Sequence, residues 1–141
     1  MTSTKENGIS GSDIRAKLKH PVVDADGHMV ETTFAILDFV KKVGGTKIAL
    51  KYESYLKANS SAPGRRAIWV GNSGPATIDR ATAMLPKLYK KRLDEAGIDF
   101  GIVYGTQALS VLRIGDDEMR PVIYRAMNTM YADMFNDLSY R

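Results

Sequence analysis

The sequence contains no cysteine, which excludes a disulfide framework and any metal site built on thiolates. It also lacks an apolar run approaching the roughly 20 residues of a membrane-spanning helix. The opening residues, MTSTKENGISGSD, contain no apolar core of the kind found in secretory signals. These absences lead us to expect a soluble cytoplasmic protein with no membrane partner.

A strong excess of one charge is missing as well. The formal net charge is +4, from 20 Lys and Arg against 16 Asp and Glu. The basic residues cluster only at Lys87, Lys90, Lys91 and Arg92, where their amphipathic spacing indicates the solvated face of a helix. Nucleic-acid recognition requires a basic stripe together with aromatic or groove-reading elements, and neither is evident. We therefore expect no nucleic-acid partner.

The chain of 141 residues, 44% hydrophobic, is sufficient for one domain with a buried core. The sequence shows a helical pattern over 77–96, then a glycine, then a buried apolar strand over 98–104. This order is typical of α/β folds. We predict further helices over 12–18, from 32 or 33 to a stop at Gly44-Gly45, over 47–57, and from 116 or 117 to 138. Residues 1–12 are expected to form a flexible arm and 44–76 an insertion containing loops, with a strand or ordered loop at 68–70.

Apolar residues at helical spacing predict the inner faces of these helices. The expected stripe of the second helix is Phe34, Leu37 and Val40, and that of the last helix is rich in methionine. The remaining stripe residues are Ile48, Tyr52, Tyr55 and Leu56 in the third helix, and Met119, Val122, Ile123, Ala126, Met130 and Met134 in the last.

The segment VVDADGH, residues 22–28, contains the strongest functional signal. Val22 and Val23 indicate a short buried strand that leads into Asp24, Asp26 and His28. Alternate side chains of a strand share a face, so these three polar groups are expected to project together. An Asp oxygen and a His nitrogen are suitable ligands for Zn²⁺ or a harder first-row ion. The alternative is a turn-capping aspartate beside a surface histidine.

The segment VVDADGHMVE, residues 22–31, resembles the opening strand of the metal-dependent amidohydrolase-related family, which includes aminocarboxymuconate-semialdehyde decarboxylase. In that family an apolar strand ends in Asp-x-His-x-His or a variant with an acidic first ligand. The runs RLDEAGIDFGIVYGT, residues 92–106, and 116–137 resemble the second strand with its flanking helices.

The resemblance implies a (β/α)₈ TIM barrel whose divalent metal ion, Zn, Mn or Fe, is held by Asp26 and His28 for hydrolysis or non-oxidative decarboxylation of a small molecule. An aspartate in the first ligand position favours Mn²⁺ or Fe²⁺ over zinc. Asp24 and Glu31 are candidates to hydrogen-bond to the ligands. Tyr104, Thr106 and Gln107 are expected to line the substrate pocket. The family's later histidines and its late catalytic aspartate have no counterpart in this sequence.

A barrel of this kind needs about 250 residues, and the chain shows only two clear strands. We therefore expect an incomplete barrel over residues 1–141: the first two strands, their helices and a helical insertion. A larger subunit, or a missing segment of the same chain, would supply the remaining ligands. Two other functions stay open: a non-catalytic scaffolding or regulatory subunit with a vestigial site, and a small stand-alone binding domain.

Overall fold

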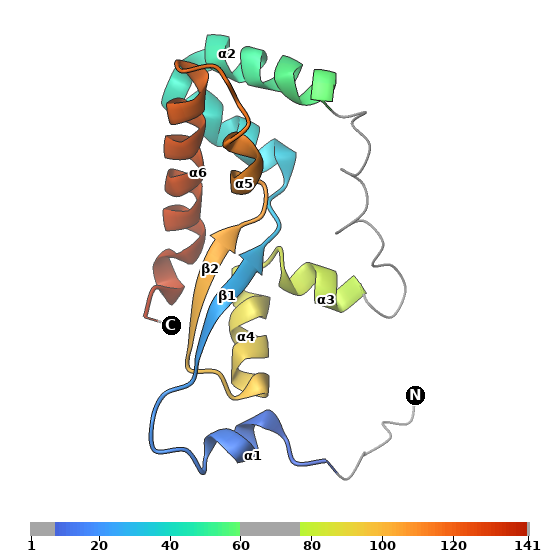
Figure 1. The fold of residues 1–141 in the computed structure, drawn as a ribbon, viewed down its shortest axis with the longest axis vertical. Helices are drawn as coiled ribbons and strands as arrows, with labels where there is room; N and C mark the ends of the chain where they lie inside the picture. The colour runs from blue at the N-terminus through green and yellow to red at the C-terminus, as the bar shows by residue number, and fades with distance from the viewer. Residues whose placement is uncertain (1–7, 60–76, 141) are drawn as a thin grey trace.

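The computed structural model describes residues 8–59 and 77–140 (Figure 1). This part of the chain is mixed α/β, as predicted, with a two-stranded parallel sheet. The strand or loop predicted at 68–70, the loop residues from 60 to 75 and the first seven residues of the predicted arm lie outside the described residues.

The sheet pairs β1 (Val23–Met29) with β2 (Phe100–Gly105). The register places Asp24 opposite Gly101 but Gly27 opposite Val103, so β1 contains one extra residue between these two pairs. Figure 1 shows both strands pointing toward the end of the molecule where α2 and α5 lie. The carboxyl ends of the two strands therefore meet at that end.

The two faces of the sheet differ in their cover. Residues Gly101, Val103 and Gly105 of β2 face α4 (Pro86–Ala96) and α6 (Met119–Phe135). The alternate residues are half exposed: Phe100 at 43%, Ile102 at 48% and Tyr104 at 49%. The sequence predicts that these residues and Val23 are buried. That prediction was wrong, because no described helix covers this face of the sheet.

The main core lies beyond the carboxyl ends of the strands, between α2 (Thr33–Asn59), α5 (Ala108–Val111) and α6. The methionine stripe of α6 is confirmed as packing. Phe34 is 83% exposed, however, and Ile36, at 0%, takes its place, so the predicted inner face of α2 was wrong at that position. The largest fully buried side chains of this core are Tyr52, Ile36, Ile114, Ile123, Met127, Met130, Val40 and Val111.

Glycine and proline set the ends of the helices. α2 changes direction at Gly45, where φ is +76°, close to the predicted stop. The helix predicted over 77–96 is divided into α3 (Thr77–Thr82) and α4, because Pro86 begins a new helix. Gly97 forms the predicted left-handed cap, with φ of +73°. The last helix ends in a 3₁₀ turn, η2 (Asn136–Leu138).

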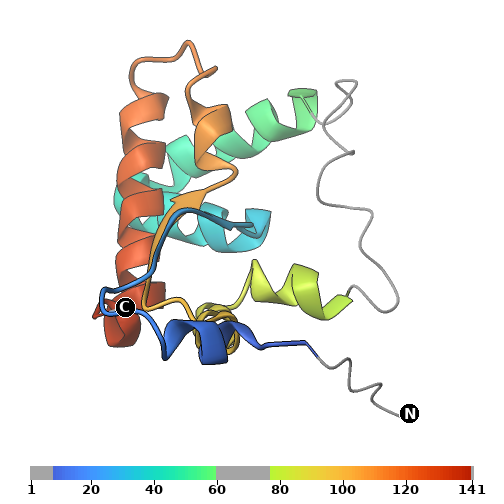
Figure 2. The same cartoon turned by 60° about the horizontal axis from the view of Figure 1, so that its bottom comes forward.

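A short helix precedes the sheet and includes residues 11 and 12. α1 (Gly11–Arg15) begins after the capping residue Ser10, not Ser12, because Ser10 and Asp13 form a capping box. Arg15 donates a hydrogen bond to Asp99, which also accepts one from the amide of Val22 at 2.7 Å. Figure 2 shows α1 packed beside α4. Asp99 thus connects α1 to the start of both strands through hydrogen bonds.

The contact between α1 and α4 predicts a difference between two glycines. A Cβ at Gly11 would lie 2.2 Å from the carbonyl oxygen of Ala96, whereas one at Gly8 would meet nothing within 4 Å. We expect Gly11→Ala to lower the free energy of unfolding by about 1–3 kcal/mol through overpacking, and Gly8→Ala by less than about 0.5 kcal/mol. Urea denaturation of both variants measures this, and equal midpoints would contradict the close packing of α1.

Among the described residues, no helix is both long enough and apolar enough to cross a membrane.

Candidate functional site

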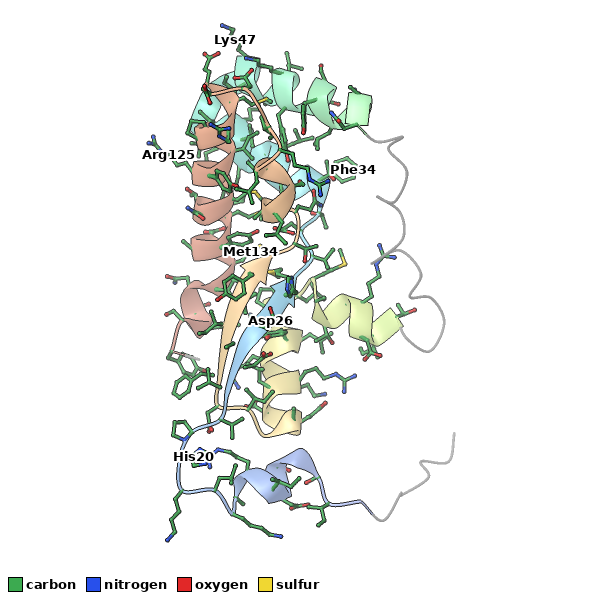
Figure 3. The ribbon with its side chains drawn as sticks, in the orientation of Figure 1. His20, Asp26, Phe34, Lys47, Arg125 and Met134 are labelled. Atoms are coloured by element: carbon green, nitrogen blue, oxygen red, sulfur yellow. The ribbon has the colours of Figure 1, made fainter. Side chains whose placement is uncertain are left out.

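Asp26 and His28 lie together on β1, on the sheet face that the described helices leave open. His28 Nε2 lies 3.4 Å from Asp26 Oδ1. The Asp26 side chain is 91% exposed and that of His28 is 33% exposed. Figure 3 labels Asp26 on the strand pair. The structure therefore brings a carboxylate oxygen and an imidazole nitrogen to one point that solvent can reach.

Asp24 does not join them, so the prediction that all three polar groups share a face was wrong. Its Oδ1 accepts a hydrogen bond from the amide of Asp26 at 3.1 Å, which stabilises the extra residue of β1. Its Oδ2 accepts one from the Tyr89 hydroxyl at 3.3 Å. A side chain at Gly27 would meet that same hydroxyl, so Asp24 and Gly27 both face α4. Burial first, and then the charge of Asp24, raise the pKa of Tyr89 to about 12, so Tyr89 stays protonated as a donor.

The other ring nitrogen of His28 faces the end of β2. Thr106 Oγ1 lies 3.4 Å from His28 Nδ1, at the outer limit of a hydrogen bond. The amide of Thr106 donates to the carbonyl of Met29 at 2.8 Å, which continues the pairing of the strands past Gly105. The imidazole is thus placed between a hydroxyl and a carboxylate.

Glu31 is buried, at 6% exposure, just after β1. Its Oε2 accepts a hydrogen bond from the amide of Gln107 at 2.8 Å, and its Oε1 accepts one from the Tyr131 hydroxyl. The Gln107 side chain returns a bond to the Glu31 carbonyl at 2.6 Å. Burial first, then the bond to Glu31, raise the pKa of Tyr131 far above its usual value, so the phenol remains a donor.

These contacts locate the other predicted site residues. Tyr104 is opposite His28 in the sheet and half exposed on the open face. The Gln107 side chain is engaged with Glu31. The role predicted for Tyr104, Thr106 and Gln107 in binding substrate stays a prediction. Tyr131 could not be predicted from the sequence, because it is 100 positions from Glu31 within an otherwise apolar helical stripe.

The geometry of Asp26 and His28 fits two ligands of one divalent ion. Ligand atoms about 2.0–2.2 Å from an ion lie roughly 3.3–3.6 Å from each other at tetrahedral angles and roughly 2.8–3.1 Å at octahedral angles. The 3.4 Å between Nε2 and Oδ1 falls in the tetrahedral range. Over residues 8–59 and 77–140 there is no group of three or more His, Cys, Asp or Glu that could hold a metal ion. A catalytic site with three protein ligands would need at least one ligand from outside these residues.

A cavity of about 340 Å³ lies on the other face of the sheet, between α4 and α6. Its walls include Tyr89, Leu93 and Tyr131, and its floor is formed by Gly101, Val103 and Gly105. The sheet separates this cavity from Asp26 and His28, so the cavity is not part of their surroundings.

A scan against protein-family models gives no match for this chain, and searches of curated proteins and of solved structures find no significant match either. The resemblance to the amidohydrolase-related family rests on the residues of the sequence alone.

Proposed function

We propose that this chain is the N-terminal portion of a metal-dependent hydrolase or non-oxidative decarboxylase of the amidohydrolase-related type, with Asp26 and His28 as two of its metal ligands. The observation that carries the proposal is the 3.4 Å approach of Nε2 to Oδ1 near the carboxyl end of a parallel strand. Active sites of (β/α)₈ barrels occupy that end of the strands.

The uneven faces of β2 support the idea of an incomplete barrel. The larger side chains lie on the open face, where Phe100, Ile102 and Tyr104 alternate with the helix-facing Gly101, Val103 and Gly105. In a barrel, the residues on the inward face fill the interior against other strands. Further strands, from a larger subunit or from another segment, would cover these half-exposed side chains and bring the missing ligands.

Each site residue then has a role that its position allows. Asp26 contributes an exposed carboxylate, and His28 contributes Nε2 while its other nitrogen is held by Thr106. Tyr104 would line the pocket beside His28. A bound Zn²⁺, Mn²⁺ or Fe²⁺ would supply Lewis-acid polarisation of a substrate oxygen. The acid–base residue would come from the completing strands.

Titration of the full chain with Mn²⁺ tests the two ligands, because the chain has only two histidines. We expect Mn²⁺ to broaden the ring signals of His28 in the NMR spectrum at concentrations that leave those of exposed His20 sharp. His28→Ala should abolish specific binding, and Asp26→Asn should weaken it about tenfold or more, since each removes one of the few ligands. His20→Ala is the matched control.

Equal broadening of both histidines, or unchanged affinity in Asp26→Asn and His28→Ala, would remove these residues from the metal site. In the completed assembly, Asp26→Ala and His28→Ala should lower metal content and turnover together.

A non-catalytic scaffolding subunit is the second candidate. The described residues contain no third ligand, which is compatible with this alternative as well as with the first proposal. On this alternative the assembled protein would carry no metal at Asp26 and His28, so metal analysis of the assembly separates the two functions.

A further inference from the structure

Glu31 is the one carboxylate that the described part of the chain buries, and its surroundings are specific. Both of its oxygens accept hydrogen bonds, from the Gln107 amide and the Tyr131 hydroxyl, and its carbonyl accepts a third bond from the Gln107 side chain. Burying a carboxylate carries a desolvation penalty, which such bonds offset only in part. An apolar side chain would fill the same space without this penalty. We therefore infer that the Glu31 carboxylate has a role other than packing.

The bonds of Glu31 converge on the segment that follows β2. The amide of Gln107 is held by Glu31, and the amide of the preceding residue, Thr106, is held by the Met29 carbonyl at 2.8 Å. Two consecutive amides at the end of β2 are thereby tied to the end of β1. This fixes the backbone of Thr106 relative to His28.

The consequence reaches the imidazole ring. The Thr106 hydroxyl faces Nδ1 of His28 at 3.4 Å, and Nε2 on the opposite side of the ring faces Asp26 at 3.4 Å. A hydroxyl can donate to an unprotonated Nδ1 or accept from a protonated one, so Thr106 can serve His28 with or without an ion at Nε2. Partners of metal-binding histidines fix the orientation of the ring.

We propose that Glu31, Gln107 and Tyr131 form a positioning cluster that holds Thr106 against Nδ1 of His28 and so keeps Nε2 directed at Asp26. The reason for positioning His28 rests on the proposed function. The contacts of the cluster are present in the chain without metal. Thr106 and Tyr131 are positioning residues: Thr106 acts on the ring directly, and Tyr131 acts through Glu31 and the loop.

NMR of the ring nitrogens in the full chain without metal, at one fixed pH, tests the positioning. We expect the Nδ1 signal of His28 to move in Thr106→Val, which removes the hydroxyl at nearly constant volume, and to return in Thr106→Ser. Tyr131→Phe should move the same signal in the same direction by a smaller amount. The His20 signals should stay in place in every variant. Tyr124→Phe, on the same helix, is the matched control and should leave His28 unchanged.

Metal affinity provides the second readout. The dissociation constant for Mn²⁺ should rise about tenfold or more in Thr106→Val, as is usual when a partner of a metal-binding histidine is lost, and Thr106→Ser should restore it. A completed assembly that carries no metal at Asp26 and His28 would overturn the proposed function, while the ring signals of the chain without metal would still decide the positioning.

A merely structural cluster would give a different result. Tyr131→Phe would then lower the melting temperature without moving the His28 ring signal, and that outcome would overturn the role of the cluster. An unmoved ring signal in Thr106→Val would overturn the role of Thr106.

Discussion

Gly105→Ala is expected to lower the free energy of unfolding by about 3 kcal/mol or more. A Cβ at Gly105 would lie 1.7 Å from the Tyr131 hydroxyl oxygen and 2.3 Å from Glu31 Oε1. The Tyr131 ring would have to move, because the ring carbon that carries its hydroxyl is also only 2.7 Å away. Its movement would break the bond to Glu31 and leave a buried carboxylate short of one donor. Thermal unfolding followed by circular dichroism should show a fall in midpoint of roughly 10 °C.

Gly115→Ala is the matched control for this substitution. A Cβ at Gly115 would meet nothing within 4 Å, and Gly115 is not among the glycines with positive φ. Its effect should stay within about 0.5 kcal/mol. If Gly105→Ala were equally neutral, the close packing of α6 on the end of β2 would be refuted.

Ile36→Ala should lose about 2–5 kcal/mol of stability, whereas Phe34→Ala should lose less than about 0.5 kcal/mol. Both residues are in the first turns of α2. The Ile36 side chain is fully enclosed by the core, so its truncation leaves a cavity, while the Phe34 side chain is 83% exposed. Urea denaturation of the two variants measures the difference.

Phe34, the larger of the two side chains, is thus expected to contribute less to the free energy of unfolding. A greater loss for Phe34→Ala than for Ile36→Ala would mean that α2 packs on the face the sequence predicts.

Much of the helix and strand pattern could be predicted from the sequence, because local signals decide it. Gly97 ends α4 as a left-handed cap, and the apolar run after it becomes β2. The face of α2 could not be predicted, because stripes through Phe34 and through Ile36 share Leu37 and Val40 and are equally apolar. The half exposure of β2 depends on which elements cover the sheet, which periodicity does not reveal.

The candidate site divides in the same way. The proximity of Asp26 and His28 follows from strand alternation and is confirmed. Alternation fails for Asp24, because its side chain bonds to the amide of Asp26 and an extra residue shifts the strand. Glu31 was a candidate partner of the ligands, but its bonds to Gln107 and Tyr131 depend on tertiary structure.

The pairing of β1 with β2 has a consequence for the order of folding. Val22 and Asp99, whose contact opens the strand pair, are 77 positions apart, so the sheet forms only after a long loop has closed. Closing such a loop costs chain entropy before any stabilising contact has formed, and this slows folding. Asp26 and His28 are neighbours on one strand and can meet before the sheet forms, whereas Thr106 and Gln107 reach β1 only when β2 pairs with it. A partly folded chain would therefore have Asp26 and His28 side by side before the contact between His28 and Thr106 has formed.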